Sequence, residues 1–344
     1  MTPINNASHS MPSKSNKINT GWLLRILLLI AAASNIPLMA AEQPAFFDYL
    51  RQTNPPPALI AYNPSNINPD DMHLSAEQLA AHVQKDLTCL KSGFNGLVLY
   101  NYNPEITPIV VEQALQSGFR GILLGVWDVK SEQELSGTVA LINKYRDKAA
   151  FAVVIGNEGL NDNRYTLADV KTAHTKLIAA GLDRMRIPLT TSEPMAGYGL
   201  ADLRLFGDFL APNIHPAIDR KELAPADAVD WVQGRAKVLA QFAKKPVFVK
   251  ETGLPNGGDA AFTPARQFEF WKMLRDKGPL LETTGLPGAW ISLAAVFEAF
   301  DSPWKAAKSG NPIEGRWGLM DEQLGAYPAF GVFAGNLNKC KSEQ

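Results

Sequence analysis

The sequence predicts an α/β fold built as a single (β/α)8 TIM barrel, and two observations lead to this prediction. Short apolar segments alternate with amphipathic helical segments from residue 58 to about residue 338, and eight such pairs fit the length of this barrel. The apolar segments are hydrophobic at consecutive positions, which is typical of parallel strands covered on both faces. A doubly wound open sheet is the alternative, but residues 62–71, at the end of the first strand, contain no glycine-rich phosphate turn.

The first predicted strand, residues 58–64, is followed by a helix at residues 74–93, in which apolar residues from Leu79 to Leu90 recur at intervals of three and four and Gly93 ends the helix. The other strands share an apolar stem and are predicted at residues 94–104, 119–128, 149–158, 186–194, 208–216, 245–255 and 288–301. Helices with the same period are predicted at residues 106–118, 131–148, 166–181, 225–243, 263–278 and, at the end, 329–338.

Residues 1–41 differ from the rest and are predicted to be a signal peptide or an N-terminal anchor. Two lysines precede the apolar run of residues 26–33, which is short for a bilayer span, and a peptidase could cut after Ala41. Met39 fits poorly at the third position before this cut, so an uncleaved inner-membrane anchor is an alternative to a periplasmic or secreted protein, and a buried core helix is another. Residues 42–57 are expected to be a linker to the barrel domain, residues 58–338.

Charge and cysteine content restrict the partners. The 33 basic and 34 acidic residues are interspersed, with a formal net charge of −1, so no nucleic-acid partner is expected and a weakly charged ligand fits better. We expect a monomer without a cofactor. A metal in particular is not expected, because neither the cysteines nor any His, Asp or Glu cluster has metal-ligand spacing. Cys89 and Cys340 would lie close if the last helix of a closed barrel packs beside the first. A bridge between them and two separate thiols are the alternatives.

Polar or aromatic residues end all eight predicted strands, at the edge where barrel enzymes carry their chemistry. In chain order they include Tyr62, Tyr100, Trp127, Asn157, Glu158, Glu193, Asn213, His215, Glu251, Glu298 and Asp301. A single such glutamate is most often solvated or ion-paired, and His215 alone is more typical of a structural hydrogen bond. Glu158 and Glu251, however, follow the fourth and seventh strands and would face each other across the mouth of the barrel.

Two opposed carboxylates are what the cleavage of a glycosidic bond requires. One protonates the departing oxygen, while the other attacks the anomeric carbon or activates water. The amide of Asn157 would then hydrogen-bond the 2-hydroxyl of the sugar. Aromatic residues predicted to be exposed would offer flat apolar faces to sugar rings, and beyond those that end strands they include Trp290, Trp304 and Trp317.

Four segments resemble the signature segments of glycoside hydrolase family 17, a family of β-1,3-glucanases and related transglycosylases on a (β/α)8 barrel. They are VVIGNEGL at residues 153–160, VKETGLP at 249–255, FEAFDSPWK at 297–305 and EGRWGL at 314–319. The resemblance is closest to the bacterial branch and extends from about residue 58 to about residue 333. The order and spacing of the four segments are more specific for this family than any single segment.

The resemblance implies roles for individual residues. Glu158 matches the acid/base of the family and Glu251 its nucleophile, while Lys305 and Glu314 match an active-site lysine and an acidic residue of the same cluster. The aromatic residues that it places around the inner sugar subsite are Tyr62, Tyr100 and Trp127.

Two departures from the family pattern leave the proposed catalytic acids in place. Family members often have tryptophan where Leu254 stands and an acid where Ser302 stands. The expected reaction is a retaining double displacement, for which the two carboxyl groups lie about 5–5.5 Å apart. The sequence leaves three activities open, because hydrolysis of β-1,3-glucan, transfer to another glucan chain and glucan binding by an inactive envelope protein would use the same residues.

Overall fold

The computed structural model describes residues 45–54, 56–281 and 288–335, which belong to one compact unit at residues 43–344. Its sheet has five parallel strands in the order β1-β2-β3-β4-β5. These are β1 (Leu59–Ala61), β2 (Gly96–Leu99), β3 (Gly121–Val126), β4 (Ala150–Asn157) and β5 (Leu189–Ser192). The predicted signal or anchor at residues 1–41, and Cys340 of the proposed bridge, lie outside the described residues.

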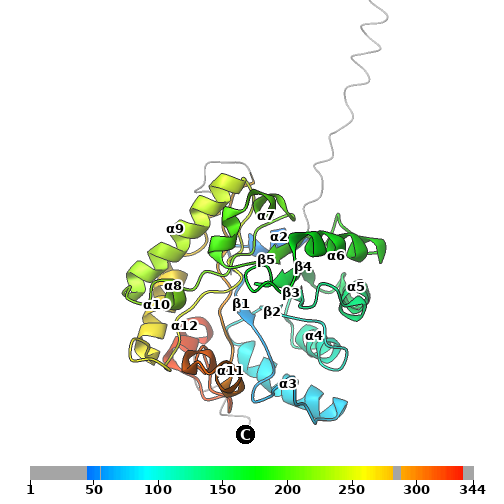
Figure 1. The fold of residues 1–344 in the computed structure, drawn as a ribbon. Helices are drawn as coiled ribbons and strands as arrows, with labels where there is room; N and C mark the ends of the chain where they lie inside the picture. Colours follow the sequence, from blue (N-terminus) through cyan, green and yellow to red (C-terminus); the bar gives the residue numbers. More distant parts are fainter. Residues whose placement is uncertain (1–44, 55, 282–287, 336–344) are drawn as a thin grey trace, which may run out of the picture. The chain divides into compact units, whose positions relative to one another are not determined.

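The helices follow the predicted alternation. The longer ones are α3 (Ala76–Leu90), α4 (Thr107–Gln116), α5 (Glu132–Tyr145), α6 (Leu167–Ala179), α9 (Pro225–Ala243) and α10 (Pro264–Lys277). Figure 1 shows them around the central strands. The shorter elements are η1 (Met195–Gly199), α7 (Ala201–Leu205), α8 (Pro216–Asp219), α11 (Pro303–Ser309), η2 (Pro312–Gly315), η3 (Pro328–Phe330) and α12 (Gly331–Ala334). The predicted last helix is thus only one turn long within the described residues.

Local sequence explains where these helices begin. Ser75 and Gln78 form a capping box at the start of α3, and Thr166 with Asp169 forms another at α6, which satisfies backbone N–H groups that have no partner within the helix. The predicted apolar stripe of α3 is buried. No helix in the part of the chain that the structure describes has the length and apolar character needed to cross a bilayer.

The predicted strands six to eight are extended segments joined by single parallel bridges. Pairs Pro194–Asn213, Leu210–Val247, Asn213–Glu251, Val247–Ile291, Thr252–Val296 and Ile60–Val296 carry the pairing from β5 back to β1. Pro212 and Pro246 have no N–H to donate and interrupt regular ladders, although their carbonyls still accept from Lys250 and Leu210. The cyclic order of parallel pairings is consistent with the predicted (β/α)8 barrel.

The strands carry one apolar cluster on the inside of this ring and another on the outside. Alternate strand residues such as Val98, Leu123, Val154 and Phe248 pack in an inner cluster, whereas their neighbours along each strand pack against the helices in a larger outer cluster. This alternation is what strands covered on both faces require. Side chains therefore fill the ring, and the polar groups gather beyond its carboxyl end.

The structure corrects the prediction that residues 42–57 are a linker. Residues Ala45–Leu50 form helix α2, whose Phe46 and Tyr49 are buried in the inner cluster. The Tyr49 hydroxyl donates to Oδ1 of Asn95, 2.7 Å away, and a Cβ at Gly121 would lie 2.1 Å from the Tyr49 ring. Helix α2 thus covers the amino-terminal ends of the strands. Its six residues are too few to show helical periodicity in the sequence.

Candidate active site

A cleft of about 450 Å³ lies at the carboxyl ends of the strands. It brings together ten of the residues that the sequence singled out, namely Tyr100, Trp127, Asn157, Glu158, His215, Glu251, Trp304, Lys305, Glu314 and Trp317. A second cavity, of about 520 Å³, is lined by residues of η1 and α9 and shares no lining residue with this cleft. The first cavity is therefore the candidate active site, because both Glu158 and Glu251 line it.

Glu158 follows a turn of the backbone at the end of β4. Gly156 has φ +79° and Glu158 itself has φ +55°, values that an L residue seldom adopts. A Cβ at Gly156 would lie 2.1 Å from the Tyr165 hydroxyl, so only glycine fits there. The Glu158 N–H donates to the Ser192 carbonyl at 2.8 Å. These contacts fix the position from which the Glu158 side chain enters the cleft.

The environment of Glu158 favours its protonated form. Burial raises the pKa of the Glu158 carboxyl, and the negative charge of Glu251 raises it further. The opposing influence is a hydrogen bond of 2.6 Å from Nδ2 of Asn213 to Oε1 of Glu158, together with the neighbouring His215 imidazole and the positive charge of Lys250. A carboxyl group that holds its proton in this way can act as a general acid.

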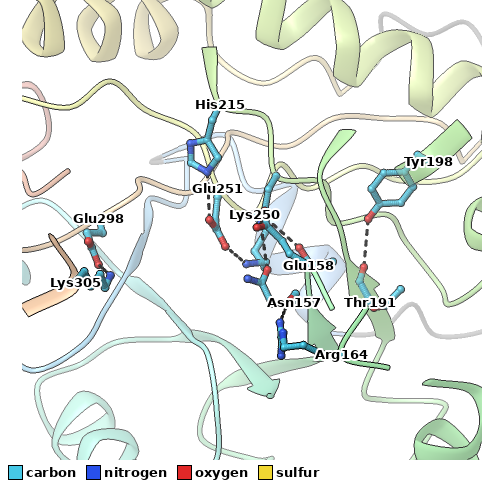
Figure 2. A network of polar contacts seen from close by, with 12 residues as sticks. Asn157, Glu158, Arg164, Thr191, Tyr198, His215, Lys250, Glu251, Glu298 and Lys305 are labelled. Carbon is cyan, nitrogen blue, oxygen red and sulfur yellow. Dashed lines mark hydrogen bonds and ion pairs between the residues drawn. The ribbon is translucent and has the colours of Figure 1, made fainter. Parts of the chain in front are cut away.

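Glu251 has the opposite environment, although it is more deeply buried. Burial alone would raise the pKa of the Glu251 carboxyl, but the adjacent Lys250 ammonium and His215 lower it to about 2. Lys250 donates to Oε1 of Glu251, and Nε2 of His215 lies 3.2 Å from Oε2. Figure 2 shows His215 and Lys250 beside the Glu251 carboxylate. Glu251 is thus held ionised, as a nucleophile requires.

Asn157 is held by two neighbours. Its Oδ1 accepts from Nδ2 of Asn213 at 3.1 Å, and its backbone carbonyl accepts from the Arg164 guanidinium. The guanidinium carbon of Arg164 also lies 4.2 Å from the ring centroid of Trp127. Trp127 keeps 42% of its surface exposed, so it can offer an aromatic surface at the cleft.

The opposite wall carries a second ion pair. Nζ of Lys305, on α11, donates to Oε2 of Glu298 at 2.5 Å. Burial raises the pKa of the Glu298 carboxyl, against the influence of the Lys305 charge. Glu298 is buried and holds Lys305 at the cleft, while Glu314 lines the cleft from η2.

Six residues predicted to bind substrate lie outside the lining of the cleft, namely Tyr62, Trp290, Glu193, Asp301, Asn213 and Glu298. Tyr62 is buried, and its hydroxyl donates to Oδ2 of Asp86 at 2.9 Å. Trp290 packs in the inner cluster beside helix α2, with its ring 5.8 Å from that of Phe47. Neither residue lines the cleft. For Tyr62, an apolar stem followed by an aromatic residue does not reveal whether the ring faces the mouth, the interior or the helices. Trp290 lies near the start of the predicted eighth strand, away from its carboxyl end.

Glu193 and Asp301 also lie outside the cleft lining. Glu193 accepts from the backbone N–H groups of Leu160 and Asn161 at 3.0 and 3.1 Å, and so holds the loop that follows Glu158. Asp301 accepts from the Gly318 N–H at 3.0 Å, beside Trp317. Both carboxylates therefore position the backbone next to cleft residues, and Asn213 and Glu298 act on the cleft through the bonds described above.

Sequence reasoning missed several residues of the site, among them Lys250, Arg164 and Phe297. Lys250 lies within the apolar stem of the seventh strand and is 2% exposed, Arg164 lies in the loop after β4, and Phe297 lines the cleft. The signal for Lys250 was present, because a lysine amid Val247, Phe248 and Val249 is rare in a buried strand unless it has a partner. No group of three or more His, Cys, Asp or Glu side chains within the described ranges is placed to hold a metal ion.

Comparisons with known proteins agree with this fold. Among solved structures, an endo-laminarinase from Formosa Hel1_33_131 has 19% identity and a TM-score of 0.61, covering 81% of this chain and 88% of that one. A glycoside hydrolase family 17 β-1,3-glucanosyltransferase from Rhizomucor miehei has 17% identity and a TM-score of 0.60, with 81% and 98% covered. The pollen β-1,3-glucanase CJP38 of Cryptomeria japonica has 16% identity and a TM-score of 0.58, with 81% and 100% covered. At these identities the likeness establishes the fold.

Comparison with the curated proteins finds no match. The model of the BtgE/BtgC glycoside hydrolase domain matches residues 60–318, a range that contains both glutamates and every residue described around the cleft. The match therefore covers most of the chain and agrees with the resemblance to family 17. The chain belongs to the family of BtgE/BtgC glycoside hydrolase domains.

Proposed function

We propose that the protein is a retaining glycosidase that cleaves β-1,3-glucan. The observation that carries this proposal is the pair of glutamates in one cleft, with a raised pKa for Glu158 and a pKa of about 2 for Glu251. Opposite protonation states of two carboxyl groups are what an acid/base and a nucleophile need at the same pH.

The substrate class is proposed from the structural neighbours. Three of them are described as a laminarinase, a β-1,3-glucanosyltransferase and a β-1,3-glucanase, and an active-site mutant of the Rhizomucor miehei enzyme was solved with laminaritriose. The cleft offers suitable surfaces for such a chain, because the exposed ring of Trp127 and the partly exposed ring of Trp304 line it together with the amide of Asn157. Aromatic faces and amides bind the apolar faces and hydroxyls of a neutral sugar.

The reaction would proceed in two displacements. In the first, a carboxylate oxygen of Glu251 bonds to the anomeric carbon as the glycosidic bond breaks, and Glu158 gives its proton to the leaving oxygen. In the second, Glu158 takes a proton from the acceptor, whose oxygen displaces Glu251. Each step inverts the anomeric carbon, so the product keeps the β configuration.

The reaction is tested by the anomer that it forms first. Proton NMR of a laminari-oligosaccharide digest should show the β-anomer before mutarotation, as retention requires. Initial release of the α-anomer would contradict the proposed role of Glu251 as nucleophile, because inversion uses a water molecule in its place.

Transfer to a second glucan is the alternative activity of the same site, and the Rhizomucor miehei neighbour is a transferase by description. Sizing the products of a single laminari-oligosaccharide over time separates the two activities. Hydrolysis yields only shorter products, whereas transfer also yields products longer than the substrate. Binding without release of any product would favour a glucan-binding protein instead.

A further inference from the structure

A lysine lies buried inside the ring of strands, directly below the cleft. Lys250 is 2% exposed and stands two residues after Phe248, which packs in the inner apolar cluster. Placing an ammonium group in such an interior is costly unless the group is paired and hydrogen-bonded. A buried cation at this position therefore calls for a functional reason.

Lys250 makes its polar contact with the nucleophile. Its Nζ donates to Oε1 of Glu251 and lies 4.5 Å from the ring centroid of Tyr100. The other oxygen of Glu251 faces Nε2 of His215 at 3.2 Å. Both oxygens of the carboxylate thus have a nitrogen partner, and the carboxylate can rotate only by losing one of them.

We propose that Lys250 is a positioning residue that keeps Glu251 ionised and oriented in the first displacement and stabilises ionised Glu158 in the second. The inference rests on the proposed function, because it needs the two glutamates to exchange charge during the reaction.

The charge balance of the reaction gives Lys250 its two roles. When the bond between Glu251 and the anomeric carbon forms and the glycosidic bond breaks, Glu251 becomes a neutral ester. The proton leaves Glu158 for the departing oxygen, so the negative charge moves from Glu251 to Glu158. A fixed ammonium group near both carboxyl groups remains beside the charge in each state and needs no rearrangement, as preorganised electrostatic stabilisation requires.

Other charged and titratable groups also face Glu251 and determine how large the contribution of Lys250 is. His215 is placed by the start of α8, Tyr100 follows β2, and the carboxyl groups of Glu158 and Glu298 face it from β4 and the eighth segment. Of these only His215 can add positive charge. The charge of Lys250 lowers the pKa of both Glu251 and Glu158, which agrees with a cation that acts on both acids.

The test is a direct titration of Glu251 in the full-length protein. Carbon-13 NMR of glutamate carboxyl groups, assigned with Glu251→Gln, would follow Glu251 in wild type, Lys250→Met and Lys250→Arg. Methionine keeps the length of the side chain and removes its charge. We expect Glu251 to titrate near pH 2 in wild type and at least about one pH unit higher in Lys250→Met, with Lys250→Arg nearer to wild type.

Lys245→Met is the matched control. Lys245 is a half-buried lysine that donates to the carbonyls of Leu205 and Gly207, away from the cleft, so its loss should leave the titration of Glu251 unchanged. An unchanged titration in folded Lys250→Met, checked by circular dichroism, would overturn the proposal. If Lys250→Met does not fold, Lys250→Gln and Lys250→Arg provide the same comparison.

Kinetics separate this inference from the proposed function. In the active enzyme, the acidic limb of kcat/KM should move to higher pH in Lys250→Met by the same amount as the NMR titration. A wild-type protein without activity on any β-glucan would refute the proposed function, whereas the NMR titration would still report whether Lys250 keeps Glu251 ionised. Activity in wild type with an unmoved acidic limb would refute the inference alone.

Discussion

The side-chain amide of Asn213 donates to Oε1 of Glu158 across 2.6 Å, although 55 residues separate the two along the chain. The same amide nitrogen donates to Oδ1 of Asn157 at 3.1 Å, and Oδ1 of Asn213 accepts from the Ser192 hydroxyl at 3.1 Å. One side chain therefore orients both the amide and the acid that end β4.

Replacing Asn213 with alanine should raise the pKa of Glu158. The hydrogen bond from Asn213 favours the ionised carboxylate and so lowers this pKa. Without that bond, burial and the charge of Glu251, which both raise the pKa of Glu158, have a larger net effect. Because Glu158 must be protonated to act as acid, the basic limb of the kcat profile should move to higher pH. The loss of orientation should lower kcat by roughly tenfold or more, as for a hydrogen bond to a charged group. An unmoved basic limb in Asn213→Ala would contradict the link to Glu158.

Glu158→Ala and Glu251→Ala should differ in how azide affects them. Without its acid, Glu158→Ala should lose about 10²–10⁴ in rate on a laminari-oligosaccharide, but less on an aryl β-glucoside whose leaving group needs no proton. Azide should then react with the glycosyl-enzyme and yield the β-glucosyl azide. Glu251→Ala cannot form that intermediate, so any azide product in this variant should have the α configuration. A β-azide from Glu251→Ala would exchange the two assignments.

Trp127→Ala should weaken the binding of substrate. Its exposed ring lines the cleft and is held by Arg164, so the change should raise the dissociation constant for a laminari-oligosaccharide by roughly fivefold, about 1 kcal/mol. Trp290→Phe is the control, because Trp290 is buried away from the cleft lining. Titration of both variants made in the Glu251→Gln background measures the affinity without turnover. Equal weakening by the two changes would contradict a role for Trp127 in binding.

Tyr62→Phe should affect folding instead of binding. The change removes the hydroxyl that donates to buried Asp86, which keeps its bonds from the N–H and hydroxyl of Ser65. We expect the free energy of unfolding, measured with urea, to fall by about 1–3 kcal/mol, while KM stays unchanged. A raised KM with unchanged stability would restore Tyr62 to the substrate-binding residues.

Glu193 should make stability depend on pH. Burial raises the pKa of its carboxyl from 4.5 to about 7, against the bonds that it accepts from Leu160 and Asn161. Between these values the folded protein binds more protons than the unfolded chain, so the Glu193 contribution is fully present below about pH 4.5 and is lost as the pH rises through 7. Thermal unfolding of Glu193→Gln should lack this decline relative to wild type. The same dependence of melting temperature on pH in wild type and in Glu193→Gln would contradict the prediction.

The sequence by itself determined the order of the elements and the two acids. Consecutive apolar positions and helical periods depend only on which faces are buried, so β1 to β5 and the six longer helices from α3 to α10 follow from pattern. The short helices α7 and α8 were not predicted. Strand ends also share one edge of a parallel sheet, which is why Glu158 and Glu251 could be placed in one cleft before any coordinates.

Only the tertiary structure decided which neighbour each side chain has. Tyr62 ends an apolar strand as Tyr100 and Trp127 do, but its hydroxyl is bonded to buried Asp86. Trp290, near the start of the predicted eighth strand, packs in the inner cluster beside helix α2.

Lys250 is paired with its neighbour in the sequence, Glu251. The network around this carboxylate is completed by His215, which comes from a separate segment. The contacts of His215 with Glu251 and of Asn213 with Glu158 join residues far apart in the chain, and no local pattern records them.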